Sequence, residues 1–325
     1  MILLKIAVVV GVTMLHVAYA TYFERKVIGH MQVRLGPMRV GYHGLLQPIA
    51  DSIKLFFKED IIPTDADKPV FKLAPIVPVF AALSALAVVP IFEGFVIADI
   101  NIGLLFILAM SSLAAYGIVM AGWASNSKYS FLGGLRSSAQ VVSYEVAIGL
   151  SLVGVMLLSG SLNLSEIVRA QQRHGHGMFV IPQFIGYFVF MVAAFAETNR
   201  APFDLPEAES ELVAGYFVEY SGMRFALFYA AEYIGMIVMS CIAVLCFWGG
   251  WTLPPMIVEA LPALAKVPGI VWFLLKVYGH LFLFYWVRAS LPRYRYDHLM
   301  SLGWKVLIPL ALGNIVLTSL AKFLL

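Results

Sequence analysis

Four carboxylates inside or beside long apolar segments are the residues in this sequence best suited to chemistry. They are Glu145, Glu197, Glu219 and Glu232. An ionisable group in hydrocarbon costs at least about 2.5 kcal/mol, so it persists mainly where it has a function or a partner. Four such groups converging on one side of a membrane favour a proton path. The alternative for each one is a pair with a buried cation such as Lys276.

A second group of acids lies in residues 197–224, which we call the acidic loop. Its further carboxylates are Asp204, Glu207, Glu209 and Glu211. If this stretch is helical, Glu207 and Glu211 share a face and repel each other, which favours uptake of a proton. The pattern predicts a proton entry that leads to Glu197, Glu145 and Glu232. A solvated loop that neutralises nearby arginines is the alternative.

Residues 24–72 form a predicted first loop with two unusual parts. Arg34 and Arg39 lie in a basic segment rich in glycine and proline, which is typical of turns. From residue 44 to 59 the apolar residues follow a helical period, with Pro48 in the first turn. We predict an amphipathic helix on the membrane surface, roofing a chamber for a lipid-soluble ligand with polar oxygens. A simple interfacial anchor is the alternative.

The last predicted loop is also polar, because Arg288, Arg293 and Arg295 follow a long apolar segment. Arginine donates hydrogen bonds that could reach a quinone-type oxygen or pair with the acidic loop. An ordinary positive stop signal is the alternative. We expect His16 and His280, which lie within apolar segments, to be packed core residues with no ligand role.

The elements that must position these residues are membrane helices. Apolar residues make up 61% of the 325 residues and charged residues only 13%, far from the soluble average. About eight segments are long enough to cross a bilayer, and a segment in hydrocarbon must pair its own backbone groups as a helix. We predict an all-α polytopic protein, one integral domain over residues 1–325. The predicted spans are 3–23, 73–92, 102–123, 139–158, 179–196, 225–248, 267–287 and 304–323.

The orientation follows from the lysines and arginines, because cytoplasmic loops keep positive charge. Most of them fall in the first, third, fifth and seventh predicted loops. We therefore predict that both termini face the periplasm or its equivalent. The net charge of +3 is explained by this bias and needs no nucleic-acid partner.

Metal and nucleotide chemistry receive no support from the sequence. The two cysteines, Cys241 and Cys246, lie in one apolar segment without a histidine or carboxylate at ligand spacing. We expect both to be core residues. A Gly-rich phosphate loop is also missing from the sequence.

Three stretches together carry a resemblance to a known family. They run from Glu24 through Arg34 and Arg39 to Asp51, from Ala196 to Glu211, and from Arg288 to Asp297. In these stretches and in its spans the sequence resembles the quinone-site membrane subunit, known as the H subunit, of NADH:quinone oxidoreductase, the respiratory complex I. This resemblance covers essentially the whole chain.

The resemblance implies roles for particular residues. Positions near the family's quinone tunnel are matched by Glu24, Arg25, Arg34, Arg39, Asp51 and Arg293. Positions in its acidic proton path are matched by Glu145, Glu197, Asp204, Glu207, Glu209, Glu211, Glu219 and Glu232, accompanied by Tyr144 and Arg200. The implied substrate is a quinone, ubiquinone or menaquinone, reduced in the peripheral arm. No metal, flavin or nucleotide is expected on this chain.

The resemblance also implies partners and a location. The expected partners are the peripheral-arm iron–sulfur and quinone-site subunits, the small and antiporter-like membrane subunits, and membrane lipid. We favour the bacterial cytoplasmic membrane over the mitochondrial or thylakoid membrane. The alternatives are the membrane anchor of a related hydrogenase and a stand-alone proton-coupled transporter. The intact acidic loop favours complex I over the first, and the lack of an evident internal repeat disfavours the second.

Overall fold

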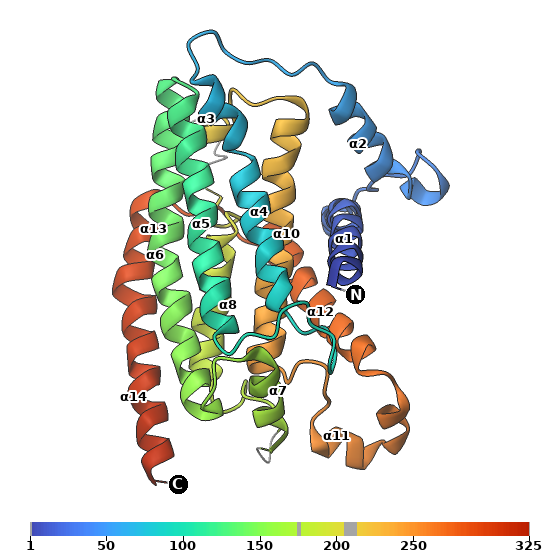
Figure 1. Cartoon of the computed structure of the whole chain (residues 1–325), viewed down its shortest axis with the longest axis vertical. Helices are drawn as coiled ribbons and strands as arrows, with labels where there is room; N and C mark the ends of the chain where they lie inside the picture. Colours follow the sequence, from blue (N-terminus) through green and yellow to red (C-terminus); the bar gives the residue numbers. More distant parts are fainter. Residues whose placement is uncertain (1, 174–176, 205–212, 325) are drawn as a thin grey trace.

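The protein folds into a bundle of membrane-length helices, seen in a computed structural model (Figure 1). The structure describes residues 2–173, 177–204 and 213–324. Within these ranges the only extended pairing is a single bridge between Phe92 and Phe95. Glu207, Glu209 and Glu211 of the predicted proton path lie outside the described residues.

Seven helices in the described part of the chain are long and apolar enough to cross a membrane. They are α1 (Ile2–Met31), the helix over Lys68–Val88 that contains α3 (Lys68–Leu73) and α4 (Ile76–Ala85), α5 (Gly103–Ala124), α6 (Lys128–Ser159), α10 (Gly222–Phe247), α12 (Gly269–Ser290), and the helix over Tyr296–Leu324. An eighth apolar helix, α8 (Phe184–Glu197), is shorter. The prediction of an all-α polytopic membrane protein is confirmed.

Shorter helical pieces connect the long ones. They are the turn Tyr42–Gly44, α2 (Gln47–Phe57), the turn Leu86–Val88, α7 (Leu164–Arg173), the turn Gly215–Phe217, α11 (Pro255–Ala260) and the turn Pro262–Lys266. The predicted amphipathic helix corresponds to α2, with Pro48 in its first turn. Its apolar residues Ile53, Phe56 and Phe57 are exposed in the isolated chain, which fits a helix that lies against lipid.

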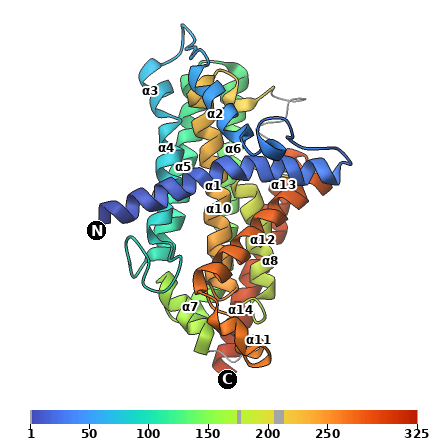
Figure 2. The same cartoon turned by 90° about the vertical axis from the view of Figure 1, so that its right-hand side faces the viewer.

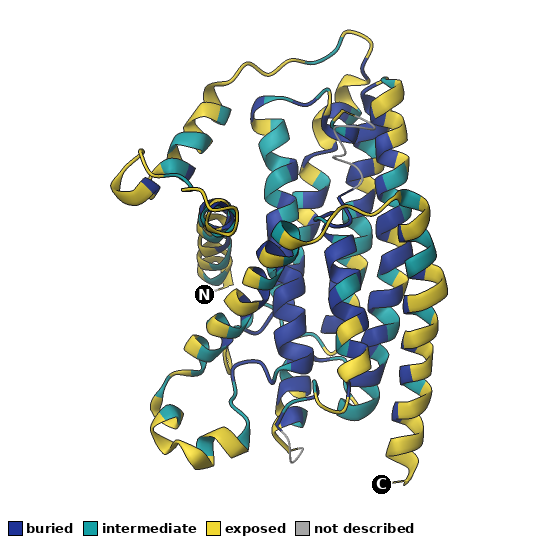
Figure 3. Cartoon of the chain, turned by 180° about the vertical axis from the view of Figure 1, so that it is seen from behind, coloured by how far each residue is buried: buried dark blue, intermediate teal, exposed yellow. Residues whose placement is uncertain are grey.

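The bundle is built around α6, α8 and α10. Helix α6 packs against α5, α8 and α14, while α10 packs against α4 and α12. Figure 3 shows α10 as the most uniformly buried long helix, with the exposed residues gathered on outer helices. Helix α1 crosses α10 and α12 at a steep angle (Figure 2). It therefore contacts the bundle along one side only.

The first helix is longer than predicted. The expected span ended at Phe23 and the first loop began at Glu24, but α1 continues to Met31. The prediction was wrong because charged residues end an apolar run without ending a helix. The helix stops where Val33 takes a positive φ of 56°. Gly29 then allows the next turn to approach, because a Cβ there would lie 3.0 Å from the amide nitrogen of Gly36.

Within the described ranges Lys276 does not pair with a carboxylate, contrary to the alternative considered from the sequence. Its ammonium donates to the backbone carbonyls of Trp248, Gly250 and Thr252 at 2.6, 3.0 and 2.6 Å. These carbonyls follow the end of α10. The three donors of Lys276 thus satisfy backbone acceptors at the end of that helix, and none remains for a glutamate.

A polar cluster of Gln183, Asn314 and Thr318 ties α14 to the bundle. Asn314 donates to the Gln183 carbonyl oxygen at 2.7 Å, and the Gln183 amide donates to Thr318 at 2.7 Å. All three side chains are buried. Gly154 of α6 makes room for them, since a Cβ there would lie 2.2 Å from the Gln183 oxygen.

The last membrane-length helix contains a change of helical type. It begins as α13 (Tyr296–Leu302), passes through a π-helical turn over Gly303–Leu307, and continues as α14 (Ile308–Leu324). Tyr144 of α6 donates its hydroxyl to the carbonyl of Leu299 at 2.9 Å, one turn before the π-helical segment. This helix therefore contacts α6 through Leu299, before the π-helical turn, and contacts Gln183 through Asn314 and Thr318, after that turn.

The two histidines behave differently. His280 is buried and hydrogen-bonded to the hydroxyl of Tyr187 at 3.0 Å, as expected for a packed core residue. His16 is only half-buried and stacks on Tyr278 with ring centroids 5.6 Å apart. The expectation of a packed core position was therefore wrong for His16. Cys241 and Cys246 are both free and buried, as predicted.

Candidate functional site

Arg200 lies at the centre of the polar residues, in the turn that follows α8. Thr198 turns the chain by donating its hydroxyl to the carbonyls of Ala194 and Phe195, at 3.0 and 3.3 Å. Gln140 of α6 holds both ends of the turn, donating its amide to the carbonyls of Ala196 and Phe203 at 2.8 and 2.9 Å. Buried hydrogen bonds of this kind, donated by a side-chain amide, fix the direction in which the Arg200 side chain leaves the backbone.

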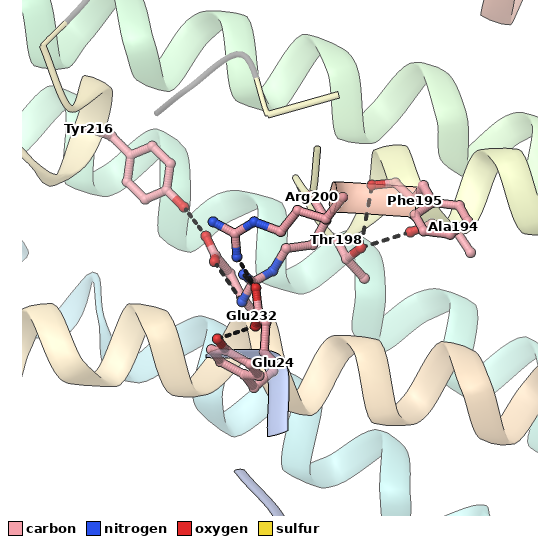
Figure 4. Close-up of polar contacts among 9 residues, drawn as sticks. Glu24, Ala194, Phe195, Thr198, Arg200, Tyr216 and Glu232 are labelled. Atoms are coloured by element: carbon pink, nitrogen blue, oxygen red, sulfur yellow. Dashed lines mark hydrogen bonds and ion pairs between the residues drawn. The ribbon is translucent and has the colours of Figure 1, made fainter. Parts of the chain in front are cut away.

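The guanidinium of Arg200 lies between two carboxylates from different helices (Figure 4). One of its terminal nitrogens is 3.6 Å from a Glu24 oxygen of α1, and the other is 3.7 Å from a Glu232 oxygen of α10. The ring of Tyr233 lies 4.3 Å from the guanidinium carbon. These separations are longer than direct hydrogen bonds, so charge attraction and the aromatic face dominate the contact.

Glu24 is held by three partners although it was predicted to lie in a loop. It is only 4% exposed. Tyr233 donates its hydroxyl to Glu24 at 2.5 Å, and Arg288 of α12 donates to the other carboxylate oxygen. A buried carboxylate needs such pairing to remain charged. We refer to Glu24, Arg200, Glu232, Tyr233 and Arg288 as the Arg200 cluster.

A small cavity of about 90 Å³ adjoins the Arg200 cluster. Glu197 and Glu232 both line it, together with Tyr216, whose hydroxyl lies 3.5 Å from a Glu232 oxygen. The rest of its wall is largely apolar and comes from α4, α5, α10 and the turn after α8. A space of this size can hold several water molecules, for which Glu197, Glu232 and Tyr216 offer polar partners.

The carboxylate of Glu197, which lines this cavity, has unusual surroundings. One of its carboxylate oxygens is buried and has no hydrogen-bond partner among the described residues. Its charge is also repelled by that of Glu145. Glu145 in turn accepts a hydrogen bond from Ser112 of α5. The structure thus brings together three of the predicted proton-path carboxylates, Glu145, Glu197 and Glu232.

The other predicted quinone-side residues form an exposed surface rather than a buried cluster. Arg25 is exposed and pairs with Asp51 of α2 at 2.7 Å. The side chain of Arg34 is exposed and hydrogen-bonds only to that of Gln32 in the described part of the chain, while Arg39 is exposed on the same segment. We refer to Arg25, Arg34, Arg39 and Asp51 as the basic surface.

The two predicted groups of residues are interleaved in space. Glu24, assigned to the quinone side, contacts Arg200 of the proton path. Arg293, also assigned to the quinone side, lies 3.4 Å from an oxygen of Asp204 of the proton path. Glu219 is half-buried on the turn before α10 and has no hydrogen bond or ion pair among the described residues. The residues predicted for the quinone side and those predicted for the proton path therefore do not form two separate groups in space.

Several residues of the site were missed at the sequence level. Arg288 was considered as a donor to a quinone-type oxygen, as a partner of the acidic loop or as an ordinary positive stop, but not as a partner of Glu24. Tyr233, Tyr216, Ser112 and Gln140 were not considered. Tyr233 directly follows Glu232 in the sequence, but its hydroxyl donates to Glu24 of α1 and not to that neighbour. The others depend on contacts between distant helices and left no local signal.

Metal chemistry has no geometric support in the described ranges. No group of three or more histidine, cysteine or acidic side chains there could hold a metal ion. The chemistry that the arrangement can perform is the binding and transfer of protons and the donation of hydrogen bonds to a polar ligand.

Comparison with known proteins matches the chain over almost its entire length. A family model described as NADH dehydrogenase matches residues 4–319. The NADH-quinone oxidoreductase H subunit of Rhodospirillum rubrum is 59% identical over 303 residues, which cover 93% of this chain and 88% of that protein. The corresponding proteins of Rickettsia typhi and Paramagnetospirillum magneticum are 56% and 55% identical, over 99% and 98% of this chain and 94% and 91% of theirs.

Proposed function

The chain belongs to the NADH dehydrogenase family as a membrane subunit of the proton-translocating NADH:quinone oxidoreductase, and from this premise we propose that it links quinone binding to proton movement. The basic surface and the first helix form the membrane part of a quinone-binding tunnel. The Arg200 cluster and the cavity beside it form the start of the proton path. The acidic loop, including the residues outside the described ranges, supplies that path with protons.

The quinone side is supported by donors that converge beside the first helix. Arg25 lies next to Glu24 on α1, and Arg288 and Tyr233 reach Glu24 from α12 and α10. Arginine and tyrosine donors match the carbonyl oxygens of a quinone. The exposed apolar face of α2 supports the roof of a chamber that is open to the lipid.

The observation that carries the proposal is the sharing of Arg200 by two carboxylates. Glu24 comes from the quinone side and Glu232 from the wall of the cavity, and both attract the same guanidinium at similar distances. In the step that we propose, Glu24 begins charged and Glu232 begins protonated, and a proton that arrives at Glu24 removes the attraction of Glu24 for the guanidinium. The guanidinium is then drawn toward Glu232, which favours the charged form of Glu232 and the release of its proton into the cavity.

The next step in the path is Glu197. It shares the cavity with Glu232, and its buried oxygen without a partner can accept a proton carried by cavity water. Glu145 follows, since its charge already interacts with that of Glu197. Tyr144 fixes the local position of α6 by its bond to Leu299. This order places Glu24 first and Glu145 last.

We also propose an orientation and a location for the chain. The basic surface and Arg293 lie on the cytoplasmic side of a bacterial cytoplasmic membrane, with both termini in the periplasm. The bacterial relatives and the distribution of lysine and arginine support this placement. The whole chain then acts as one membrane domain, and the basic surface is covered by the peripheral-arm subunits.

The proposal is tested in the assembled complex with Glu24→Gln and Glu232→Gln. Both variants should lose most proton transport and slow quinone reduction, while electron transfer from NADH to an artificial acceptor continues. Glu259→Gln, at an exposed position of α11, is the matched control and should behave as the wild type. Full quinone-linked proton transport in both cluster variants would overturn the proposal.

A further inference from the structure

An open pocket lies at the end of the bundle where the chain enters α3, leaves α5 and enters α6 (Figure 1). Its volume is about 610 Å³, within the range of about 300–1,000 Å³ that is usual for ligand pockets. It shares no lining residue with the cavity beside the Arg200 cluster. We call it the α5–α6 pocket.

The α5–α6 pocket has charged side chains of both signs. Asp65 and Asp67, in the segment before α3, supply two carboxylates, and Lys128 at the start of α6 supplies an ammonium group. All three residues are exposed, and none of them makes an ion pair with another residue in the described part of the chain. Opposite charges that line one pocket without pairing are complementary to a ligand that carries both charges.

The backbone joins the two sides of the pocket. Asp67 donates its amide to the carbonyl of Ala124 at 3.1 Å, which holds the segment before α3 against the end of α5. Asn126 takes a positive φ of 47° in the turn between α5 and α6. The side chain of Ser127, the N-cap residue of α6, makes no capping hydrogen bond among the described residues. The first amides of α6 can therefore also donate to an anion beside Lys128.

Trp123 places the pocket at the boundary of the membrane. Helix α5 has 22 residues, which span about 33 Å at 1.5 Å per residue and match a hydrocarbon core of about 30 Å. Trp123 is the second-last residue of this helix and is 67% exposed, as is usual for tryptophan at the interface of lipid and water. The charged lining of the pocket therefore lies at the level of the lipid head groups.

An exposed apolar strip continues from the pocket along the outside of α5 and α6. On α5 the exposed residues Tyr116, Val119 and Trp123 are three and four positions apart and share one face. On α6 the exposed residues Phe131 and Leu135 are four positions apart. The rings of Trp123 and Phe131 lie with their centroids 6.0 Å apart, so the two rows start at the same place. The strip offers a surface for the acyl chains of a lipid whose head group lies in the pocket.

We propose that the α5–α6 pocket binds the head group of a zwitterionic phospholipid that has a primary ammonium, as in phosphatidylethanolamine. The ammonium donates hydrogen bonds to the carboxylates of Asp65 and Asp67, and the phosphate accepts them from Lys128. A choline head group has no N–H group to donate, and the two carboxylates repel an anionic head group such as that of phosphatidylglycerol. This inference does not depend on the proposed quinone function.

The test uses the assembled complex in lipid vesicles that contain a phosphatidylethanolamine with a photoreactive group near its glycerol. After illumination we expect label on peptides that contain Trp123 or Phe131. Unlabelled phosphatidylethanolamine should suppress this labelling at a mole fraction about fivefold lower than phosphatidylcholine or phosphatidylglycerol, the modest factor expected for exposed charge contacts.

The sign of the selectivity should follow the charges of the pocket. Asp65→Lys combined with Asp67→Lys makes the pocket wholly basic, so phosphatidylglycerol should become the stronger competitor. The milder pair Asp65→Asn and Asp67→Asn should abolish the preference for phosphatidylethanolamine over phosphatidylcholine. Glu259→Gln combined with Lys266→Gln, at exposed positions between α10 and α12, is the matched control and should keep the wild-type preference. A preference for phosphatidylethanolamine that persists in the lysine variant would overturn the inference.

Three further results with the wild-type complex would also overturn it. Equal suppression by the three phospholipids would mean that the pocket takes part only in a general lipid shell. If these peptides are not labelled, another subunit covers the pocket. If soluble phosphoethanolamine suppresses the labelling as effectively as the lipid does, the ligand is a soluble phosphate compound. None of these results affects the proposed function, which fails only if the Glu24 and Glu232 variants still transport protons.

Discussion

The Arg200 cluster and the basic surface use similar residues in opposite ways. In the Arg200 cluster, Glu24 is buried and paired with cations from two other segments of the same chain. In the basic surface, Arg25, Arg34 and Arg39 are exposed, and only Arg25 has a carboxylate partner in the described part of the chain. The first region is completed by the chain itself. The second leaves its arginine side chains exposed, and in the function that we propose they face another protein of the complex or a ligand.

The largest effect should come from breaking the Arg200 cluster. Arg200→Met leaves Glu24 and Glu232 without their shared cation, and removing one member of a buried ion pair costs about 3–5 kcal/mol. We expect little assembled complex and a lower unfolding temperature, measured by native gel and thermal melting. Adding Glu24→Gln to this variant should recover part of the loss. An unfolding temperature equal to that of the wild type would mean that the Arg200 cluster contributes no more to the stability of the fold than the basic surface does.

The second effect concerns proton transfer without loss of the fold. Glu197→Gln keeps the size of a buried side chain but removes its proton-binding site. We expect proton transport to fall about tenfold or more, which is a change in barrier of about 1.4 kcal/mol, with electron transfer from NADH to an artificial acceptor intact. The measurement is proton uptake in vesicles, with Glu259→Gln as the control. Normal proton transport would exclude Glu197 from the path.

The third effect belongs to the basic surface. Arg25→Ala removes an exposed charge-assisted donor, so the affinity for quinone or a competitive inhibitor should fall about tenfold, while the complex remains assembled. Inhibitor titration and KM measure this change. Lys54→Ala, which removes another exposed cation near Asp51, is the control. If Arg25→Ala instead prevents assembly, the basic surface is structural in the same sense as the Arg200 cluster.

The smallest effect should come from α2. Phe57 is 80% exposed and faces lipid in our proposal, so Phe57→Cys should change stability by less than about 0.5 kcal/mol. A spin label on this cysteine should be relaxed by oxygen dissolved in the lipid. A label on Lys54→Cys should respond to a water-soluble relaxation agent instead. If the label on Phe57→Cys responded to the water-soluble agent and the label on Lys54→Cys responded to oxygen, α2 would not lie on the membrane with its apolar face toward the lipid.

The sequence predicted the helices well because hydropathy is a local property. It predicted α2 for the same reason, since the helical period of Ile49, Ile53 and Phe56 needs no tertiary information. It failed at Glu24, because the cations that allow this residue inside a helix come from Arg200 and Arg288, far along the chain. The contacts that bring the predicted quinone residues and proton-path residues together, between Glu24 and Arg200 and between Arg293 and Asp204, also join positions far apart in the sequence.

The π-helical turn over Gly303–Leu307 has a consequence for the register of the last helix. A π-helical turn accommodates one residue more than an α-helical turn, and each residue of an α-helix advances the chain by about 100° around the axis. Deleting one residue from this turn would rotate α14 relative to α13 by that angle. Leu299 could then still accept the bond from Tyr144, but Asn314 and Thr318 would face away from Gln183. The extra residue of the π-helical turn therefore sets the rotation of α14 about its axis, so that one continuous helix makes both the contact with Tyr144 and the contact with Gln183.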